Sequence, residues 1–168
     1  MFKKGAFIFY GTVGVCRVND ISSMDFSGND RLYYSLTPSF ENDTTIYIPV
    51  DSDKVMMREI MTRQEAEHFV LSWPDIDCPQ HANYREQTAA HQQILKSGNS
   101  LELGSMIKEI SRQTCSGKRS GKPLSGNQRD VIKLAQKLLF GELSVALDIQ
   151  PEEVPNYIEM QTERYQPV

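Results

Sequence analysis

Long apolar runs are missing from this sequence, and no stretch approaches the ~18 consecutive apolar residues that a membrane-spanning helix requires. Residues 1–5 include two lysines, but no apolar segment follows them, so a secretory signal peptide is not expected. Cysteine is scarce, and Cys16, Cys78 and Cys115 are widely spaced and odd in number, which favours reduced thiols. These absences predict a cytoplasmic protein that does not contact a membrane.

Residue sets typical of catalysis or metal binding are also missing. The histidines are scattered, and neither a nucleophile–base set nor a carboxylate pair stands out. Cys78 and His81, with His91 or Cys115 as distant partners, make only half of a structural zinc pattern. Segment 117–123 resembles a phosphate-binding loop, but its spacing is one residue short and a proline replaces the Ser/Thr. We therefore expect no enzyme, no metal and no cofactor, and a small hydrolase is the weakest alternative.

Positive charge is concentrated in one part of an acidic chain. The formal net charge is −4, yet between residues 115 and 137 Asp130 is the only acidic residue among several cations. A local basic patch favours contact with an anion at one place over general adhesion to nucleic acid. A solvated helix face and loop would give the same pattern, so charge alone leaves both interpretations open. The cations are Lys118, Arg119, Lys122, Arg129, Lys133 and Lys137.

The first ~55 residues have the pattern of β-strands. Short runs rich in β-branched and aromatic residues are separated by turn residues such as those at 27–30 and 41–43. Strands this short and this few can roll into a small antiparallel barrel. The expected strands lie at residues 7–10, 13–18, 32–36 and 44–50.

After about residue 60 the apolar period becomes helical. Three capping-box patterns predict helix starts, because a Ser, Thr or Asn stands three residues before a Glu or Gln. They are Thr62 with Glu65, Asn99 with Glu102, and Ser125 with Gln128. The remaining expectations are a first helix through Trp73, a linker between Pro74 and Pro79, a helix from Asn83 to Ser97 ended by Gly98, a loop at 116–122, and a final short helix opened by Pro151.

These patterns predict an α+β protein in which a β module precedes a helical bundle. The expected domains are a β-barrel at residues 1–63, a short helix and linker at 64–81, and a helical domain at 82–168.

Two stretches carry a family resemblance. Residues 2–18, FKKGAFIFYGTVGVCRV, place an apolar strand and a Tyr before a glycine turn and a second strand, and the later runs YYSL and IYIPV follow in order. Residues 123–143 begin with Pro-Leu-Ser and end with Leu-Phe-Gly-Glu-Leu. Over about residues 2–145 the chain resembles the CarD/CdnL family of bacterial transcription regulators. Their first domain is shared with the polymerase-interacting module of the transcription-repair coupling factor.

The resemblance implies a Tudor/SH3-like barrel that binds the β subunit of RNA polymerase and a helical domain that binds double-stranded promoter DNA. It implies a non-enzymatic regulator of initiation that stabilises the open complex near the upstream edge of the −10 element. We expect a monomer, associated with the nucleoid through the polymerase. The alternative is a protein–protein adaptor on RNA polymerase without direct DNA binding.

The chain departs from the family pattern on the barrel. The family usually has Asp, Pro and His at the places that here hold Ala6, Gly11 and Val13. Basic side chains that help the family dock on polymerase match Met24 and Tyr47 here, which makes the expected contact more apolar. The residues expected to bind polymerase are Met24, Tyr47 and Pro49.

The resemblance also points to residues that would contact DNA. The family keeps an aromatic, commonly Trp after Asn, which wedges into the minor groove, and Asn83-Tyr84 falls at that place. The alternative for Tyr84 is an ordinary aromatic that packs on the bundle, and Trp73 is expected in the core or between the domains. Arg129 matches a basic residue that contacts the DNA backbone. The expected DNA-binding residues are Tyr84, Arg85, Lys118, Arg119, Lys122 and Arg129.

Overall fold

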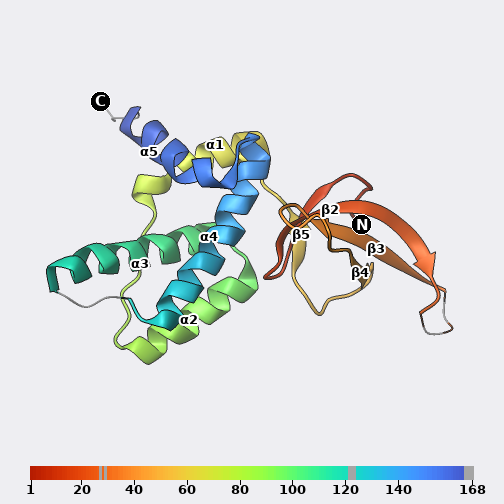
Figure 1. Cartoon of the computed structure of the whole chain (residues 1–168), viewed down its shortest axis with the longest axis horizontal. Helices are drawn as coiled ribbons and strands as arrows, with labels where there is room; N and C mark the ends of the chain where they lie inside the picture. The colour runs from red at the N-terminus through yellow and green to blue at the C-terminus, as the bar shows by residue number, and fades with distance from the viewer. Residues whose placement is uncertain (27, 29, 121–123, 165–168) are drawn as a thin grey trace. The chain divides into compact units, whose positions relative to one another are not determined.

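The structure, a computed structural model, describes residues 1–168 except 27, 29, 121–123 and 165–168, and except the side chains of 114–120 and 164. The chain divides into two compact units, Met1–Ile60 and Met61–Val168. The first unit holds the strands and the second holds the helices (Figure 1). This is the α+β class that the sequence predicted.

The first unit is an antiparallel sheet with the strand order β4-β3-β2-β1-β5. Within the part of the chain that the structure describes, β4 and β5 are the edges and no pairing between them closes a barrel. β5 has three residues and pairs with β1. It is too short to show the alternating apolar pattern of a strand, and it forms because β1 offers an edge with which it can pair. The strands are β1 Phe7–Tyr10, β2 Gly14–Met24, β3 Arg31–Pro38, β4 Ile46–Pro49 and β5 Met57–Glu59.

One face of this sheet forms the core of the first unit. On β3, Tyr34 and Leu36 are buried and alternate with less buried neighbours, as the period of a strand requires. The Tyr34 hydroxyl accepts a hydrogen bond from the Phe2 N–H at 2.9 Å, so the buried phenol is satisfied. The core cluster consists of Ile8, Cys16, Val18, Tyr34, Leu36 and Ile48.

The second unit contains five α-helices and two 3₁₀ turns in its described residues. Both capping boxes at Thr62 and Ser125 are formed, which confirms these two helix starts. Asn83 caps the helix after the linker, and Gly98 ends it with a φ of 60°. The helices are α1 Arg63–Leu71, α2 Tyr84–Ser97, α3 Ser100–Ser120, α4 Gly126–Leu147 and α5 Val154–Arg164, and the turns are η1 Trp73–Asp75 and η2 Pro151–Glu153.

Three local predictions need correction. The first helix ends at Leu71 instead of Trp73, which belongs to the 3₁₀ turn. The Asn99 side chain accepts from the Glu102 N–H, but the Glu102 carboxylate accepts from the Ser97 hydroxyl, so Ser97 takes part in that cap. The loop expected at 116–122 is helical as far as Ser120, because a helix that is already packed propagates at little cost.

α4 is the central helix of this unit and packs against α1, α2, α3 and α5. Its Glu142 is fully buried and ties the helices together. One carboxylate oxygen accepts from the Met61 N–H at 2.9 Å, and the other accepts from the Ser100 hydroxyl at 3.0 Å. Because α1, the short helix expected in segment 64–81, packs on α4 and α5, it lies in the helical unit.

The segment between α1 and α2 is fastened to α3. Trp73 packs edge-on against Phe69, and both rings lie over Gly104, where even a Cβ would come within 3.2–3.3 Å of them. The Lys108 ammonium donates to the carbonyls of Trp73 and Ile76 at 2.8 and 2.7 Å, and to that of Pro74 at 3.1 Å. Burial lowers the pKa of Lys108. Trp73 therefore packs within the helical unit. None of the described helices combines the length and the apolarity needed to cross a membrane.

Candidate functional site

The N-terminal ends of α2 and α4 meet at Tyr84. Tyr84 is the first residue of α2, and its hydroxyl accepts a hydrogen bond from the Asn127 side chain of α4 at 3.4 Å. Asn83 holds the helix start, because its side chain accepts from the Glu86 N–H at 3.0 Å. The Tyr84 side chain remains 53% exposed, so the ring lies on the surface.

The environment of Tyr84 is polar and favours negative charge. Hydrogen bonds from Asn127, and next from Ser125, lower the pKa of Tyr84. The unpaired N–H groups at two helix starts add positive partial charge, and Arg85 and Arg129 are exposed within one turn of those starts. The hydroxyl is thus already engaged by the protein, and the ring face remains open for a ligand.

A cavity of about 520 Å³ adjoins the Tyr84 ring. Its lining includes Arg112 and Gln113 of α3, which the sequence did not nominate. Arg112 is exposed, so the cavity places a third arginine near the start of α2. No spacing pattern in the sequence links residue 112 with residue 84, because their proximity depends on how α2 packs on α3.

The other basic residues expected at the site have a different placement. Lys118 and Arg119 belong to the last turn of α3, and not to a flexible loop as predicted. Their side chains lie outside the described part of the structure, and Lys122 lies outside it entirely. Among the six expected DNA-binding residues, the side chains that the structure describes are therefore those of Tyr84, Arg85 and Arg129.

In the sheet unit, the three residues expected to bind polymerase share the face opposite the core. Tyr47 pairs with Ser35, Pro49 pairs with Tyr33, and Met24 pairs with Arg31. Residues that pair directly in an antiparallel sheet point to the same side. Since Arg31, Tyr33 and Ser35 alternate along β3 with the buried residues, Met24, Tyr47 and Pro49 lie together on the outer face.

Two further aromatic rings, Phe26 and Tyr33, complete this face, and neither was predicted from the sequence. Phe26 is 64% exposed, and its ring centroid lies 5.2 Å from that of Tyr33 and 6.1 Å from that of Tyr47. Arg31 on the same face is paired with Asp51 at 2.8 Å, so its charge is compensated. We call Met24, Phe26, Tyr33, Tyr47 and Pro49 the aromatic face.

Comparison with known families agrees with this division into two units. Residues 2–61 match the model of the CarD-like/TRCF RID domain, and residues 70–159 match the model of the CarD C-terminal domain. The second match alone covers more than half of the chain. The chain belongs to the CarD family. The resemblance inferred from the sequence is thereby confirmed. No curated protein matches the chain.

Membership of the CarD family makes this a transcription-related protein that interacts with RNA polymerase. The RID domain is a module that interacts with the polymerase β subunit, and its match coincides with the sheet unit. The family is one of non-enzymatic transcription factors. The second match begins at residue 70, within α1, and covers the helices that surround Tyr84.

Proposed function

We propose that this CarD family protein regulates transcription initiation by binding promoter DNA with its helical unit while its sheet unit docks on the polymerase β subunit. The observation that carries the proposal is the exposed Tyr84 ring at the junction of two helix starts. An aromatic ring held at a positively polarised surface suits a partner that combines phosphates with stacked bases.

The helical unit would bind the DNA minor groove near the upstream edge of the −10 element. Arg85 and Arg129 would contact phosphates and set the position of the protein, without reading sequence. The Tyr84 ring would enter a base step that is already partly unstacked, where it replaces lost stacking. Because such a step exists only when the DNA is opening, this contact binds the open complex better than the closed one and shifts the equilibrium toward it.

The sheet unit would hold the protein on the polymerase through the aromatic face. The five residues of this face carry no charged side chain, and the neighbouring Arg31 is paired with Asp51, so the partner surface would be apolar. Aromatic side chains are enriched at the centres of protein interfaces because each buries a large area. We propose that one chain acts as a monomer, by binding alone and without a cofactor.

The experiment that tests this function measures the lifetime of open promoter complexes after addition of a competitor, with and without the chain. The expected result is a longer lifetime together with an added footprint upstream of the −10 element. If the chain binds polymerase but changes neither the lifetime nor the footprint, the proposed DNA contact is wrong.

A second candidate is an adaptor that binds polymerase and another protein but not DNA. The net charge of −4 and the apolar character of the aromatic face favour it. Salt dependence separates the two candidates, because each neutralised phosphate releases counterions and lowers DNA affinity as salt rises. An adaptor would show no salt-dependent binding to a promoter fragment.

A further inference from the structure

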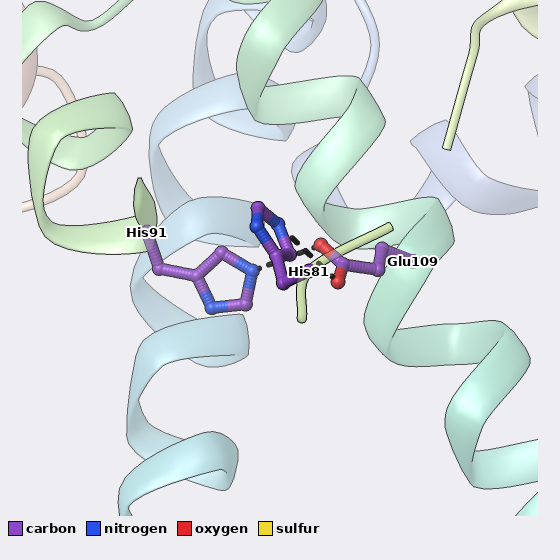
Figure 2. A group of neighbouring side chains, drawn as sticks. All are labelled: His81, His91 and Glu109. Carbon is purple, nitrogen blue, oxygen red and sulfur yellow. Dashed lines mark hydrogen bonds and ion pairs between the residues drawn. The ribbon is translucent and has the colours of Figure 1, made fainter. Parts of the chain in front are cut away.

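Three side chains able to bind a metal converge inside the helical unit, as Figure 2 shows. His91 comes from α2, Glu109 from α3, and His81 from the irregular segment before α2. The His91 Nε2 lies 3.0 Å from one Glu109 carboxylate oxygen, and the His81 Nε2 lies 3.6 Å from the other. All the ligand atoms lie within 4.8 Å of one another.

This group is buried, so a carboxylate charge within it costs free energy unless an opposite charge compensates it. Glu109 is 6% exposed and His91 is 4% exposed. Gln87 donates a hydrogen bond to Glu109 at 2.7 Å, but a neutral amide does not compensate the charge of a buried carboxylate. The His81 Nε2 is itself buried and has no hydrogen-bond partner among the described residues. A cation between the three side chains would compensate the charge of Glu109 and give the His81 Nε2 a partner.

The geometry suits a small divalent ion. Zinc bonds of about 2.0–2.1 Å in a tetrahedral site place neighbouring ligand atoms roughly 3.3 Å apart. The distances to the Glu109 carboxylate, 3.0 Å from His91 to one oxygen and 3.6 Å from His81 to the other, lie on either side of that value, and a small side-chain adjustment would bring all three ligands, now within 4.8 Å of one another, around one ion. Gln87 donates a hydrogen bond to the Glu109 carboxylate and would orient it, as residues that contact metal ligands commonly do. The cavity of about 520 Å³ is lined by both His81 and Glu109 and leaves room for water at a fourth position.

We propose that His81, His91 and Glu109 bind one Zn²⁺ ion, with water completing the coordination. The ion would link α2, α3 and the segment that leads into Asn83, and so would hold the start of α2 in place. In the sequence, Cys78 and His81 with His91 or Cys115 make only half of a structural zinc pattern, so no metal was expected. No spacing in the sequence marked Glu109 as a ligand, since it joins the group only through the packing of α3 on α2. The proposal concerns the ion alone and does not depend on DNA binding.

The test uses the full chain after dialysis against a chelator. Adding Zn²⁺ should raise the thermal midpoint and saturate at one ion per chain, because an ion that binds only the folded state stabilises it. Co²⁺ in place of Zn²⁺ should give the visible absorption of a tetrahedral nitrogen and oxygen site. It should lack the near-ultraviolet charge-transfer band of a thiolate ligand, so a site at Cys78 would be recognised.

His81→Ala is the decisive variant, because His81 lies in an irregular segment and its loss should leave the helices folded. It should weaken Zn²⁺ binding by more than the ~10–100-fold typical of losing an outer partner of a ligand. His68→Ala is the matched control, because His68 is exposed on α1 and outside the group, and it should bind Zn²⁺ unchanged. Glu109→Gln, which keeps the shape of the side chain, should also lose the ion.

Three results would overturn the proposal. The first is a wild-type chain with no Zn²⁺-dependent shift of the thermal midpoint and no Co²⁺ spectrum. The second is equal weakening by His81→Ala and His68→Ala in chains with native circular dichroism. The third is loss of Co²⁺ binding in Cys78→Ser. The Co²⁺ spectrum of the wild-type chain tests whether the proposed site exists even where a variant fails to fold.

Discussion

Among single residues, Tyr84 has the clearest separation between a structural and a functional role. Its ring is 53% exposed, and its hydroxyl interacts only with polar side chains at the surface, Asn127 at 3.4 Å and Ser125 among those described. Loss of the ring therefore removes little packing from the bundle. An effect on promoter complexes that appears without an effect on stability would come from the surface that the ring offers.

Tyr84→Ala should shorten the lifetime of the open complex and leave polymerase affinity unchanged. The effect should be on the order of 1–3 kcal/mol, which is the range for stacking between an aromatic ring and a base. Tyr84→Phe keeps the ring and should retain most of the lifetime, and Tyr84→Trp should keep or lengthen it. Competitor challenge gives the lifetime and thermal unfolding gives the control. An unchanged lifetime in a folded Tyr84→Ala chain would rule out the wedge.

Gly11 explains one departure from the family pattern. The family usually has proline at this place, yet here Gly11 has a φ of 43°, and its N–H donates to the Met56 carbonyl at 2.9 Å. A proline can satisfy neither condition, because its ring holds φ near −65° and it lacks the N–H. A Cβ at this position would also lie 2.5 Å from a methyl carbon of Val55.

Restoring the family residue should therefore harm this chain. Gly11→Pro should lower the free energy of unfolding by about 3 kcal/mol or more, because it loses a hydrogen bond and forces a different φ. The measurement is urea unfolding monitored by circular dichroism. Gly126→Ala is the control, since no atom lies within 4 Å of its added Cβ and its φ is not positive. Equal stability of Gly11→Pro and wild type would contradict this account of the turn.

Among the helices, α4 is held in its central position partly by the buried carboxylate of Glu142. Glu142 lies in the Leu-Phe-Gly-Glu-Leu run that carried part of the family resemblance, and it is fully buried. Its two oxygens accept from Met61 before α1 and from Ser100 at the start of α3. The residue therefore joins three elements that are distant in sequence, which gives the motif a structural role.

Glu142→Ala should destabilise the helical unit by about 3 kcal/mol, because Met61 and Ser100 both lose a charged acceptor. Glu142→Gln should cost less, since one amide oxygen can still accept. Chemical denaturation of each variant gives the values. Glu159→Ala, which removes an exposed carboxylate from α5, should be close to neutral. A neutral Glu142→Ala would show that these hydrogen bonds contribute nothing net.

Elements differ in how far local sequence predicts them. The capping boxes at Thr62 and Ser125 were correctly predicted because their hydrogen bonds join residues three apart. The predicted end of α3 was wrong. Gly117 and its neighbours suggested a loop, whereas a helix that is already formed extends at little cost. β5 was missed, since a three-residue strand exists only where another strand leaves an edge to pair with.

For the molecule as a whole, the division into two units would let the two proposed binding activities be separated. The aromatic face belongs to the sheet unit, and Tyr84 belongs to the helical unit. A substitution in one unit should therefore affect one binding event and spare the other. This expectation distinguishes a two-partner regulator from a protein with one mixed surface.

Tyr47→Glu in the full chain should weaken capture of the polymerase β subunit at least about tenfold, because it buries a charge at an apolar contact. Binding to a free promoter fragment should not change. Phe40→Glu is the matched control, since Phe40 is 46% exposed in the same unit but outside the aromatic face. If Phe40→Glu weakens capture as much as Tyr47→Glu, the docking surface lies elsewhere on the sheet unit.

Sequence by itself determined the α+β class, the order of strands before helices, most helix starts and the family. Each of these depends on residues close together in the chain or on the order of short motifs. Tertiary structure alone decided which residues share a surface. Tyr84 and Asn127 are 43 positions apart, and Glu109 follows His81 by 28, so neither spacing has a local period. Their proximity arises only when helix packing offsets the entropy of closing the intervening chain.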